Sequence, residues 1–183
     1  HVTQALANSG NKIIAIDELN HYYDINLKLD RLMQLGLHSN AASNEWISDK
    51  HNITFIKTST YDRVKIEELF STNKFDYVIH LAAQAGVRNS ITNPYDYTKS
   101  NIEGFLPILE GCRNHPVKHL LYASSSSVYG NSKKIPFEET DIVDNPISLY
   151  AVTKKANELL AYTYSHLYAI PTTGLRFFTV YGP

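Results

Sequence analysis

Cysteine is almost absent from this sequence: Cys112 is the single example among 183 residues. One cysteine cannot form an internal disulfide, so a reducing cytoplasm fits the chain best. The formal net charge is −1 and no segment is rich in Lys or Arg, which gives no electrostatic signature for nucleic acid or an anionic membrane surface. No uninterrupted apolar stretch reaches the roughly 18 residues of a membrane span. We therefore expect neither a nucleic-acid partner nor a membrane partner.

Signals of a complete start and end are also missing. The first residue is His1 rather than Met, and "HVTQALANSG" has the pattern of a helix that ends at Gly10, without a signal-peptide pattern before it. At the other end, "RFFTVYGP" directly follows an apolar strand, with no polar tail. We expect residues 1–183 to form one domain that is truncated at both ends.

Short apolar runs alternate with helical periodicity along the chain. Strands are predicted at 12–17, 53–57, 75–83, 117–125 and 171–180, and their nearly continuous apolar character is typical of strands covered on both faces. Apolar residues recur at helical spacing in 63–73 and 157–169. The alternation predicts an α/β fold with a doubly wound parallel sheet. The polar stretch 18–52 is expected to hold a helix within a surface excursion.

An acidic residue, Asp17, ends the first predicted strand. In a dinucleotide-binding fold, a carboxylate at this place accepts hydrogen bonds from the adenosine ribose and repels the extra phosphate of NADP, which favours NAD. The alternative is an ordinary turn or cap carboxylate. The glycine fingerprint that would decide between them is absent, and it would be expected just upstream of His1.

Small residues follow another strand in "HLAAQAGVR", residues 80–88. Ala82, Ala83 and Gly86 would let a flat ligand approach the backbone at a strand's carboxyl end, although tight packing under a helix uses the same lack of side chains. Arg88 could bind a carboxylate or phosphate with two parallel hydrogen bonds, or form a surface ion pair.

A tyrosine and a lysine stand four residues apart in "YAVTK", residues 150–154. This spacing places Tyr150 and Lys154 on one face of a helix, and Ser148 suits its start. A nearby ammonium stabilises phenolate, as a general base acting on an alcohol requires. The four serines of "ASSSSVYG" follow a strand about 25 residues earlier, where a hydroxyl could share the proton and orient the alcohol. The alternative is that Tyr150 and Lys154 are simply an exposed pair of side chains on a helix surface.

The histidines do not predict a metal site. His115 and His119 have a metal-like spacing, but Pro116 and the strand that begins near 117 break any shared helical face. His80 lies inside a strand and is expected to be a core residue.

Taken together, the motifs "AAQAGVR", "ASSSSVYG", "NPISLYAVTKKANE" and "GLRFFTVYGP" resemble the extended short-chain dehydrogenase/reductases. Within that family the chain is most similar to NAD-dependent nucleotide-sugar epimerases of the UDP-glucuronate 4-epimerase type, including those of capsular-polysaccharide synthesis. The resemblance covers essentially the whole chain and implies a Rossmann-like NAD-binding domain.

By position, the resemblance implies a set of site residues. Tyr150 would be the base, with Lys154 lowering its pKa and holding the nicotinamide ribose, and Ser125 would be the catalytic hydroxyl. The cofactor would be NAD, in contact with Asp17, Leu81, Ala82, Ala83, Asn101, Tyr150, Lys154 and Phe178. The sugar and its carboxylate would contact Arg88, Ser125, Ser126, Ser127 and Thr179.

The sequence departs from the family pattern in three places. It lacks the first strand with its glycine loop, and it lacks the C-terminal portion that holds uridine diphosphate in the family. Thr58 and Ser59 stand where relatives usually show Gly-Asp near the adenine.

The implied reaction is inversion at carbon 4 of a UDP-sugar through a 4-keto intermediate, with UDP-glucuronate and UDP-galacturonate as the pair. Holding the carboxylate with Arg88 and the serines could prevent loss of carbon dioxide from the intermediate. A UDP-glucuronate decarboxylase, a neutral UDP-hexose 4-epimerase and a non-catalytic nucleotide-binding module remain alternatives. A dehydratase is disfavoured, because Ser126 and Ser127 replace its Asp-Glu pair.

Relatives commonly pair through helices that include the one with the Tyr, which implies a homodimer.

Overall fold

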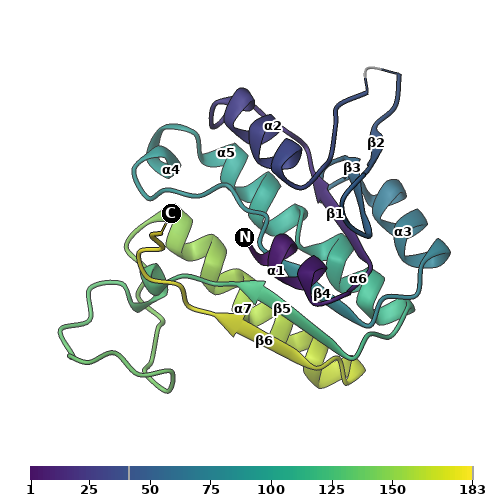
Figure 1. Cartoon of the computed structure of the whole chain (residues 1–183). Helices are drawn as coiled ribbons and strands as arrows, with labels where there is room; N and C mark the ends of the chain where they lie inside the picture. The colour runs from purple at the N-terminus through teal and green to yellow at the C-terminus, as the bar shows by residue number, and fades with distance from the viewer. Residues whose placement is uncertain (41, 183) are drawn as a thin grey trace. The chain divides into compact units, whose positions relative to one another are not determined.

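The computed structural model describes residues 1–40 and 42–182, which fall into two compact units (Figure 1). Unit 1 is His1–Thr60 and unit 2 is Tyr61–Pro183. Each unit contains a three-stranded sheet of its own, with the order β1-β3-β2 in the first and β4-β5-β6 in the second. Among the described residues, no helix is long and apolar enough to cross a membrane.

Unit 1 is built on the parallel pair of β1 (Ile13–Asp17) and β3 (Ile53–Lys57), in which Ile13 lies opposite Ile53 and Asp17 opposite Lys57. The helix α1 (Val2–Asn8) precedes β1, and α2 (Ile25–Gln34) follows it. A core cluster of Leu19, Leu37, Trp46, Ile53 and Phe55 holds the unit together.

The polar stretch 18–52 contains the expected helix and one strand that was not expected. Asp24 caps α2, because its side chain accepts a hydrogen bond from the Asn26 amide at 2.9 Å. The missed strand, β2 (Glu45–Ile47), pairs antiparallel with β3. It is three residues long and buries only Trp46, whose ring packs on Phe55, so the sequence carries little strand signal there.

Unit 2 alternates strands and helices around an all-parallel sheet. Its strands are β4 (Tyr77–His80), β5 (His119–Ala123) and β6 (Thr172–Leu175). Its helices are α3 (Arg63–Thr72), α4 (Asn89–Thr92), α5 (Pro94–Tyr97), α6 (Leu106–Asn114) and α7 (Leu149–Tyr168), with a π-helical turn η1 (Thr98–Glu103) and a 3-10 turn η2 (Ser126–Tyr129).

The three strands of unit 2 are shorter than the sequence predicts. The sequence predicts strands at 75–83, 117–125 and 171–180, and these ranges extend beyond the observed strands mainly at the carboxyl ends. There the backbone finds other partners: the Gln84 amide donates to the Asn101 side chain at 2.7 Å, and the Ser126 amide donates to the Phe177 carbonyl at 2.8 Å. These departures from the sheet ladder create the loops that carry the candidate site.

Burial on both faces, expected for the strands, is wrong for β4 within this chain. His80 is buried and stacks on Phe105, the residue before α6, with the ring centroids 5.0 Å apart. Tyr77 and Ile79 alternate with it and point to the opposite face, where they are 60% and 38% exposed.

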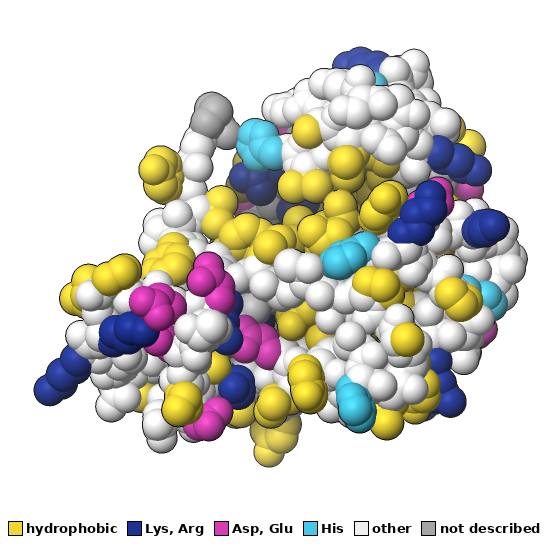
Figure 2. Space-filling model, turned by 90° about the horizontal axis from the view of Figure 1, so that it is seen from below, with side chains coloured by type: hydrophobic (Ala, Val, Ile, Leu, Met, Phe, Trp, Pro, Cys, Tyr) yellow, Lys and Arg dark blue, Asp and Glu magenta, His cyan; other side chains and the backbone are white. Residues whose placement is uncertain are grey.

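A long loop, 131–148, joins η2 to α7 and carries many charged side chains. Lys134 forms ion pairs with Glu138, at 2.8 Å, and with Asp141, while Lys155 of α7 reaches Asp144 at 3.3 Å. Acidic and basic side chains lie side by side over this loop at the left edge of Figure 2. Phe137 anchors the loop by stacking on Tyr129 at 4.5 Å.

The helix α7 begins where the sequence predicts a helix start. Ser148 has extended backbone angles, and its side chain accepts a hydrogen bond from the Ala151 amide at 3.1 Å. The cap therefore fixes the first turn of α7, which contains Tyr150.

Replacing this cap tests how α7 is started. We expect Ser148→Ala to lower the free energy of unfolding by about 1 kcal/mol, because one amide of the first turn loses its partner. Thr163→Ala on the exposed side of α7 is the control, with an expected change within about 0.5 kcal/mol. Urea unfolding measures both, and equal losses in the two variants would contradict the role of the cap.

Candidate active site

The site residues predicted in unit 2 gather at the carboxyl ends of its parallel strands. The serine run directly follows β5, and α7, whose first turns carry Tyr150 and Lys154, packs against η2 and β6. Ligands of open α/β sheets bind at this edge. The structure thus brings the serines, the tyrosine and the lysine to one region of unit 2.

The serine turn, residues 124–127, is locked by its own hydrogen bonds. Ser125 is 7% exposed, and its hydroxyl oxygen accepts a hydrogen bond from the Ser127 amide at 3.1 Å, which caps η2. Gly130 closes the turn with a φ of +59°, and a Cβ there would lie 2.1 Å from the Asn145 carbonyl oxygen. The position of Ser125 is therefore set by the backbone on both sides of it.

Lys154 is a buried amine at the end of β5. It is 2% exposed, and its Nζ donates to the Ala123 carbonyl at 2.8 Å. Burial lowers the pKa of Lys154 to about 8, because the charged form loses its hydration. A lysine with this pKa changes its charge within a range that is useful for proton transfer.

Tyr150 is partly exposed, one helical turn before the buried lysine. Its ring packs edge-on with the Tyr97 ring, with the centroids 6.2 Å apart, and the one hydroxyl proton of Tyr97 is shared between the carbonyls of Ala85 and Gly86, at 2.6 and 2.7 Å. These contacts link Tyr150 to the loop after β4, the segment expected to accommodate a flat ligand.

Asn101, predicted to lie near the nicotinamide, is the centre of a buried network. Its side chain accepts from the Gln84 amide and donates to the Gln84 carbonyl and the Thr153 hydroxyl, at 2.7, 3.1 and 2.9 Å. Its carbonyl accepts from Asn157 at 2.7 Å, within the π-helical turn η1. Asn101 therefore fastens the β4 loop to α7; its contact with a cofactor stays a prediction.

The remaining predicted residues of unit 2 lie on loops around this edge. Phe178 is 60% exposed and belongs to an aromatic stack with Phe137 and Tyr129. Residues exposed after β4 or β6 are Leu81, Ala82, Arg88 and Thr179, whereas Ala83 and Ser126 and Ser127 are partly buried. Their contacts with cofactor or sugar stay predictions.

Asp17 in unit 1 is a turn carboxylate at the end of β1, and its contact with a ribose stays a prediction. Its side chain is 49% exposed at the carboxyl end of β1, and Lys28 Nζ lies 3.7 Å from Oδ1. The same oxygen accepts a hydrogen bond from the Leu19 amide at 2.6 Å, as a turn carboxylate does, and Leu19 has a φ of +52°. A half-exposed carboxylate at a strand end fits a ribose hydroxyl pair.

The histidines have structural partners. His115 lies 3.0 Å from Glu67, and His119 lies 2.8 Å from the Thr173 hydroxyl. Burial lowers the pKa of His80 to about 3, with the Lys154 charge contributing, so the ring is neutral in the core. Within residues 1–40 and 42–182, no group of three or more His, Cys, Asp and Glu could hold a metal ion.

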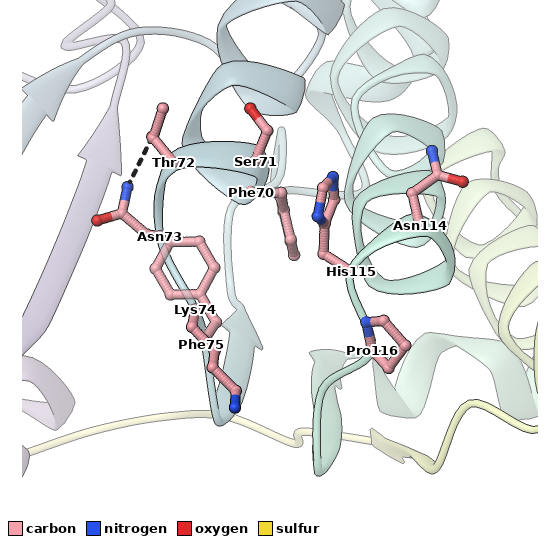
Figure 3. A pocket seen from close by; sticks show the side chains of 9 residues that line it. All are labelled: Phe70, Ser71, Thr72, Asn73, Lys74, Phe75, Asn114, His115 and Pro116. Carbon is pink, nitrogen blue, oxygen red and sulfur yellow. Dashed lines mark hydrogen bonds between the residues drawn. The ribbon is translucent and has the colours of Figure 1, made fainter.

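A hollow of about 420 Å³ lies at the opposite edge of the unit 2 sheet (Figure 3). Phe70, Phe75, His115 and Pro116 line it, together with residues 71–74 and Asn114. These residues precede β4 and β5, so the hollow is at the amino ends of the strands, away from Ser125 and Tyr150. We do not assign the chemistry to it, because ligands of such sheets bind at the carboxyl ends.

Sequence reasoning missed a partly buried charged network beside the serine turn. Glu158 of α7 binds Ser124 and Arg176, which follow β5 and β6. The available signal was the position of Glu158, four residues after Lys154 and eight after Tyr150, which places it along the same side of α7.

The chain is similar to curated proteins over its whole length. The chain is 48% identical to protein CapI of Staphylococcus aureus, covering 100% of this chain and 51% of that protein. It is 44% identical to UDP-glucuronate 4-epimerase 2 of Arabidopsis thaliana, covering 100% of this chain and 39% of that protein. The chain thus spans about half the length, or less, of these curated relatives.

Solved structures show the same fold. The UDP-glucuronic acid 4-epimerase of Bacillus cereus, determined with UDP-glucuronic acid and NAD, superposes with a TM-score of 0.83 at 31% identity, over 100% of this chain and 54% of that one. The expected Rossmann-like α/β fold is confirmed. The profile of the NAD dependent epimerase/dehydratase family matches residues 1–183. This chain belongs to the NAD-dependent epimerase/dehydratase family.

Proposed function

We propose that the protein is an NAD-dependent UDP-sugar 4-epimerase that interconverts UDP-glucuronate and UDP-galacturonate. The observation that carries the proposal is the arrangement of a partly exposed Tyr150, a buried Lys154 and a capped Ser125 at the carboxyl edge of the unit 2 sheet. Similarity to proteins named as UDP-glucuronate 4-epimerases supports the choice of substrate.

The three side chains have distinct roles in this proposal. Tyr150 takes the proton of the sugar 4-hydroxyl as phenolate and returns it to the keto oxygen. Lys154 favours the phenolate when it is protonated, and its low pKa lets it exchange that proton near neutral pH. Ser125 orients the 4-hydroxyl, since the turn already fixes its oxygen.

One side chain in each unit supports NAD as the cofactor. Asp17 offers a half-exposed carboxylate for the adenosine ribose, and Lys154 offers its amine for the nicotinamide ribose. When bound, NAD would accept and return the hydrogen of carbon 4, which makes a 4-keto sugar the common intermediate. We propose that residues 1–183 together form one NAD-binding domain, with Leu81, Ala82, Ala83, Asn101 and Phe178 along the cofactor.

The sugar carboxylate distinguishes this substrate from neutral hexoses. Arg88 is exposed on the loop after β4, which leaves its guanidinium accessible for a bidentate contact. Hydroxyls of Ser126, Ser127 and Thr179 complete the proposed contacts. Held in this way, the carboxylate of the intermediate is kept out of the orientation in which carbon dioxide leaves.

A homodimer is also part of the proposal. Apolar side chains of α7 are exposed at Val152, Leu159 and Tyr162, by 42%, 55% and 71%. Spacings of seven and three residues place them along one side of the helix, as in helix pairs that pack across an interface.

Product analysis of the full-length protein tests the function. We expect incubation with NAD and UDP-glucuronate to give UDP-galacturonate, identified by proton NMR. A UDP-pentose with carbon dioxide would move the assignment to a decarboxylase, and turnover of neutral UDP-hexoses alone would move it to a hexose epimerase. NAD binding without turnover of any of these sugars would favour a binding module.

Removing the phenol tests the assigned base. We expect Tyr150→Phe to lower kcat by about 10²–10⁴-fold while NAD stays bound, because only the proton acceptor is lost. Tyr168→Phe, near the end of the same helix, is the matched control and keeps its activity. Comparable activity in the two variants would assign the base elsewhere.

Replacing Lys154 tests the cost of burying its amine. The pKa of Lys154 is about 8 in the native state and about 10.5 in the unfolded chain. Between pH 8 and pH 10.5 the unfolded state therefore binds more protons than the native state. The stability of the wild-type protein rises with pH across this range. We expect Lys154→Met to be inactive and more stable at pH 7 by about 1–2 kcal/mol, after the loss of the Ala123 hydrogen bond is included.

The stability gain of Lys154→Met should shrink as the pH rises from 8 to 10.5. In this range the native wild-type protein buries a neutral amine, and the cost of burying a charged one is lost. Chemical unfolding of the cofactor-free protein at pH 7 and pH 10 measures it. Lys155→Met is the control, since Lys155 is paired near the surface. A gain that is the same at both pH values would show that the native pKa of Lys154 is not lowered.

A further inference from the structure

Three polar residues from different elements of unit 2 meet behind the serine turn. The Ser124 hydroxyl donates to Glu158 Oε1 at 2.6 Å. Arg176 donates to both carboxylate oxygens, from Nε to Oε1 at 2.9 Å and from a terminal nitrogen to Oε2 at 3.0 Å. The cluster therefore joins the end of β5, the middle of α7 and the end of β6.

This cluster is partly buried, and its carboxyl group is ionised. Ser124 is 2% exposed, and the side chains of Glu158 and Arg176 are 15% and 18% exposed. Burial alone would raise the pKa of the Glu158 carboxyl, but the hydrogen bonds from Arg176 and Ser124 outweigh it and hold that pKa below its usual value. A carboxylate that accepts three hydrogen bonds has a fixed orientation.

The cluster holds the serine turn from two sides. On one side, Glu158 binds the hydroxyl of Ser124, the residue immediately before Ser125. On the other side, the Phe177 carbonyl, next to Arg176, accepts a hydrogen bond from the Ser126 amide at 2.8 Å. Ser125 thus lies between Ser124, which belongs to the cluster, and Ser126, which binds the residue next to Arg176.

The same cluster fixes the register of α7 against β5. Lys154 binds the Ala123 carbonyl and Glu158, one turn later, binds Ser124, so two successive turns contact two successive residues. Tyr150 lies on this rigid helix, about 12 Å along the axis from Glu158 at 1.5 Å per residue. A slide of α7 along β5 would therefore move Tyr150 away from Ser125.

Arg176 extends the connection to the loop 131–148. Its guanidinium donates to the Glu139 carbonyl at 3.2 Å and lies over the Tyr129 ring at 5.0 Å. The Tyr129 hydroxyl in turn donates to the Glu138 carbonyl at 3.1 Å. The loop that leads into α7 is thereby held by the same residues as the serine turn.

We propose that Ser124, Glu158 and Arg176 are positioning residues that set the separation of Ser125 and Tyr150 for proton transfer. The proposal rests on the function proposed above and adds to it three residues that do not touch the sugar. Misplacement of reacting groups by about 1 Å can lower a rate about 10²-fold, so a network of this kind acts on kcat.

Kinetics of the full-length protein test the network. We expect Glu158→Gln to lower kcat about 10–100-fold and Ser124→Ala about 5–10-fold, with KM within about 2-fold of wild type, because the substrate contacts remain. The double variant should lose no more than Glu158→Gln alone, since both changes break one connection.

Glu110→Gln is the matched control for these variants. Glu110 also accepts hydrogen bonds from a hydroxyl, that of Tyr164, and from an arginine, Arg113, but this triad lies between α6 and α7. We expect Glu110→Gln to keep kcat. Equal effects of Glu110→Gln and Glu158→Gln, or a parallel rise of KM, would overturn the positioning role. If Glu158→Gln does not fold, Ser124→Ala carries the test, because it leaves the ion pair intact.

Backbone amide exchange separates this proposal from the proposed function. We expect Ser124→Ala to speed exchange in residues 124–130, while exchange in Ile13–Asp17 stays unchanged. Unchanged exchange in residues 124–130 would overturn the network even in an active enzyme. A wild-type protein that turns over none of the UDP-sugars would refute the proposed function, and the exchange result would still decide whether the network holds the turn.

Discussion

The hydrogen bond from the buried Lys154 amine to the Ala123 carbonyl is the interaction on which the candidate site depends. It places an ionisable group in a dry environment, where its pKa falls to about 8, at the point where β5 gives way to the serine turn. Lysine in such a place is costly for folding, because its charged form loses hydration. The unfavourable burial occurs one helical turn from Tyr150, at the candidate site.

A series of polar contacts attaches the first half of α7 to the rest of unit 2. Ser148 caps its start, Thr153 and Asn157 bind Asn101, Lys154 binds Ala123, and Glu158 binds Ser124 and Arg176. Directional bonds fix both the rotation and the register of a helix, whereas apolar packing tolerates small slides. A site that needs a phenol and a hydroxyl at a fixed separation benefits from this construction.

Much of this architecture could be predicted from the sequence, and what could not has physical reasons. The β1 and β3 strands, α3 and the cap at Ser148 follow from apolar periodicity and capping preference, and Tyr150 and Lys154 follow from their helical spacing. The short strand β2 could not be predicted, because a single buried residue, Trp46, gives no periodicity. The role of Glu158 escaped because its partners, Ser124 and Arg176, are 34 and 18 residues away and meet it only in the folded chain.

The central claim is that burial at the end of β5 gives Lys154 an amine that titrates near neutral pH. The most direct measurement is an NMR titration of lysine labelled with ¹³C at Cε in the cofactor-free full-length protein, with the Lys154 signal assigned from Lys154→Arg. The structure predicts a midpoint near pH 8. A midpoint near the ordinary lysine value of about 10.4 would mean that the amine is hydrated and would contradict the proposed arrangement of the site.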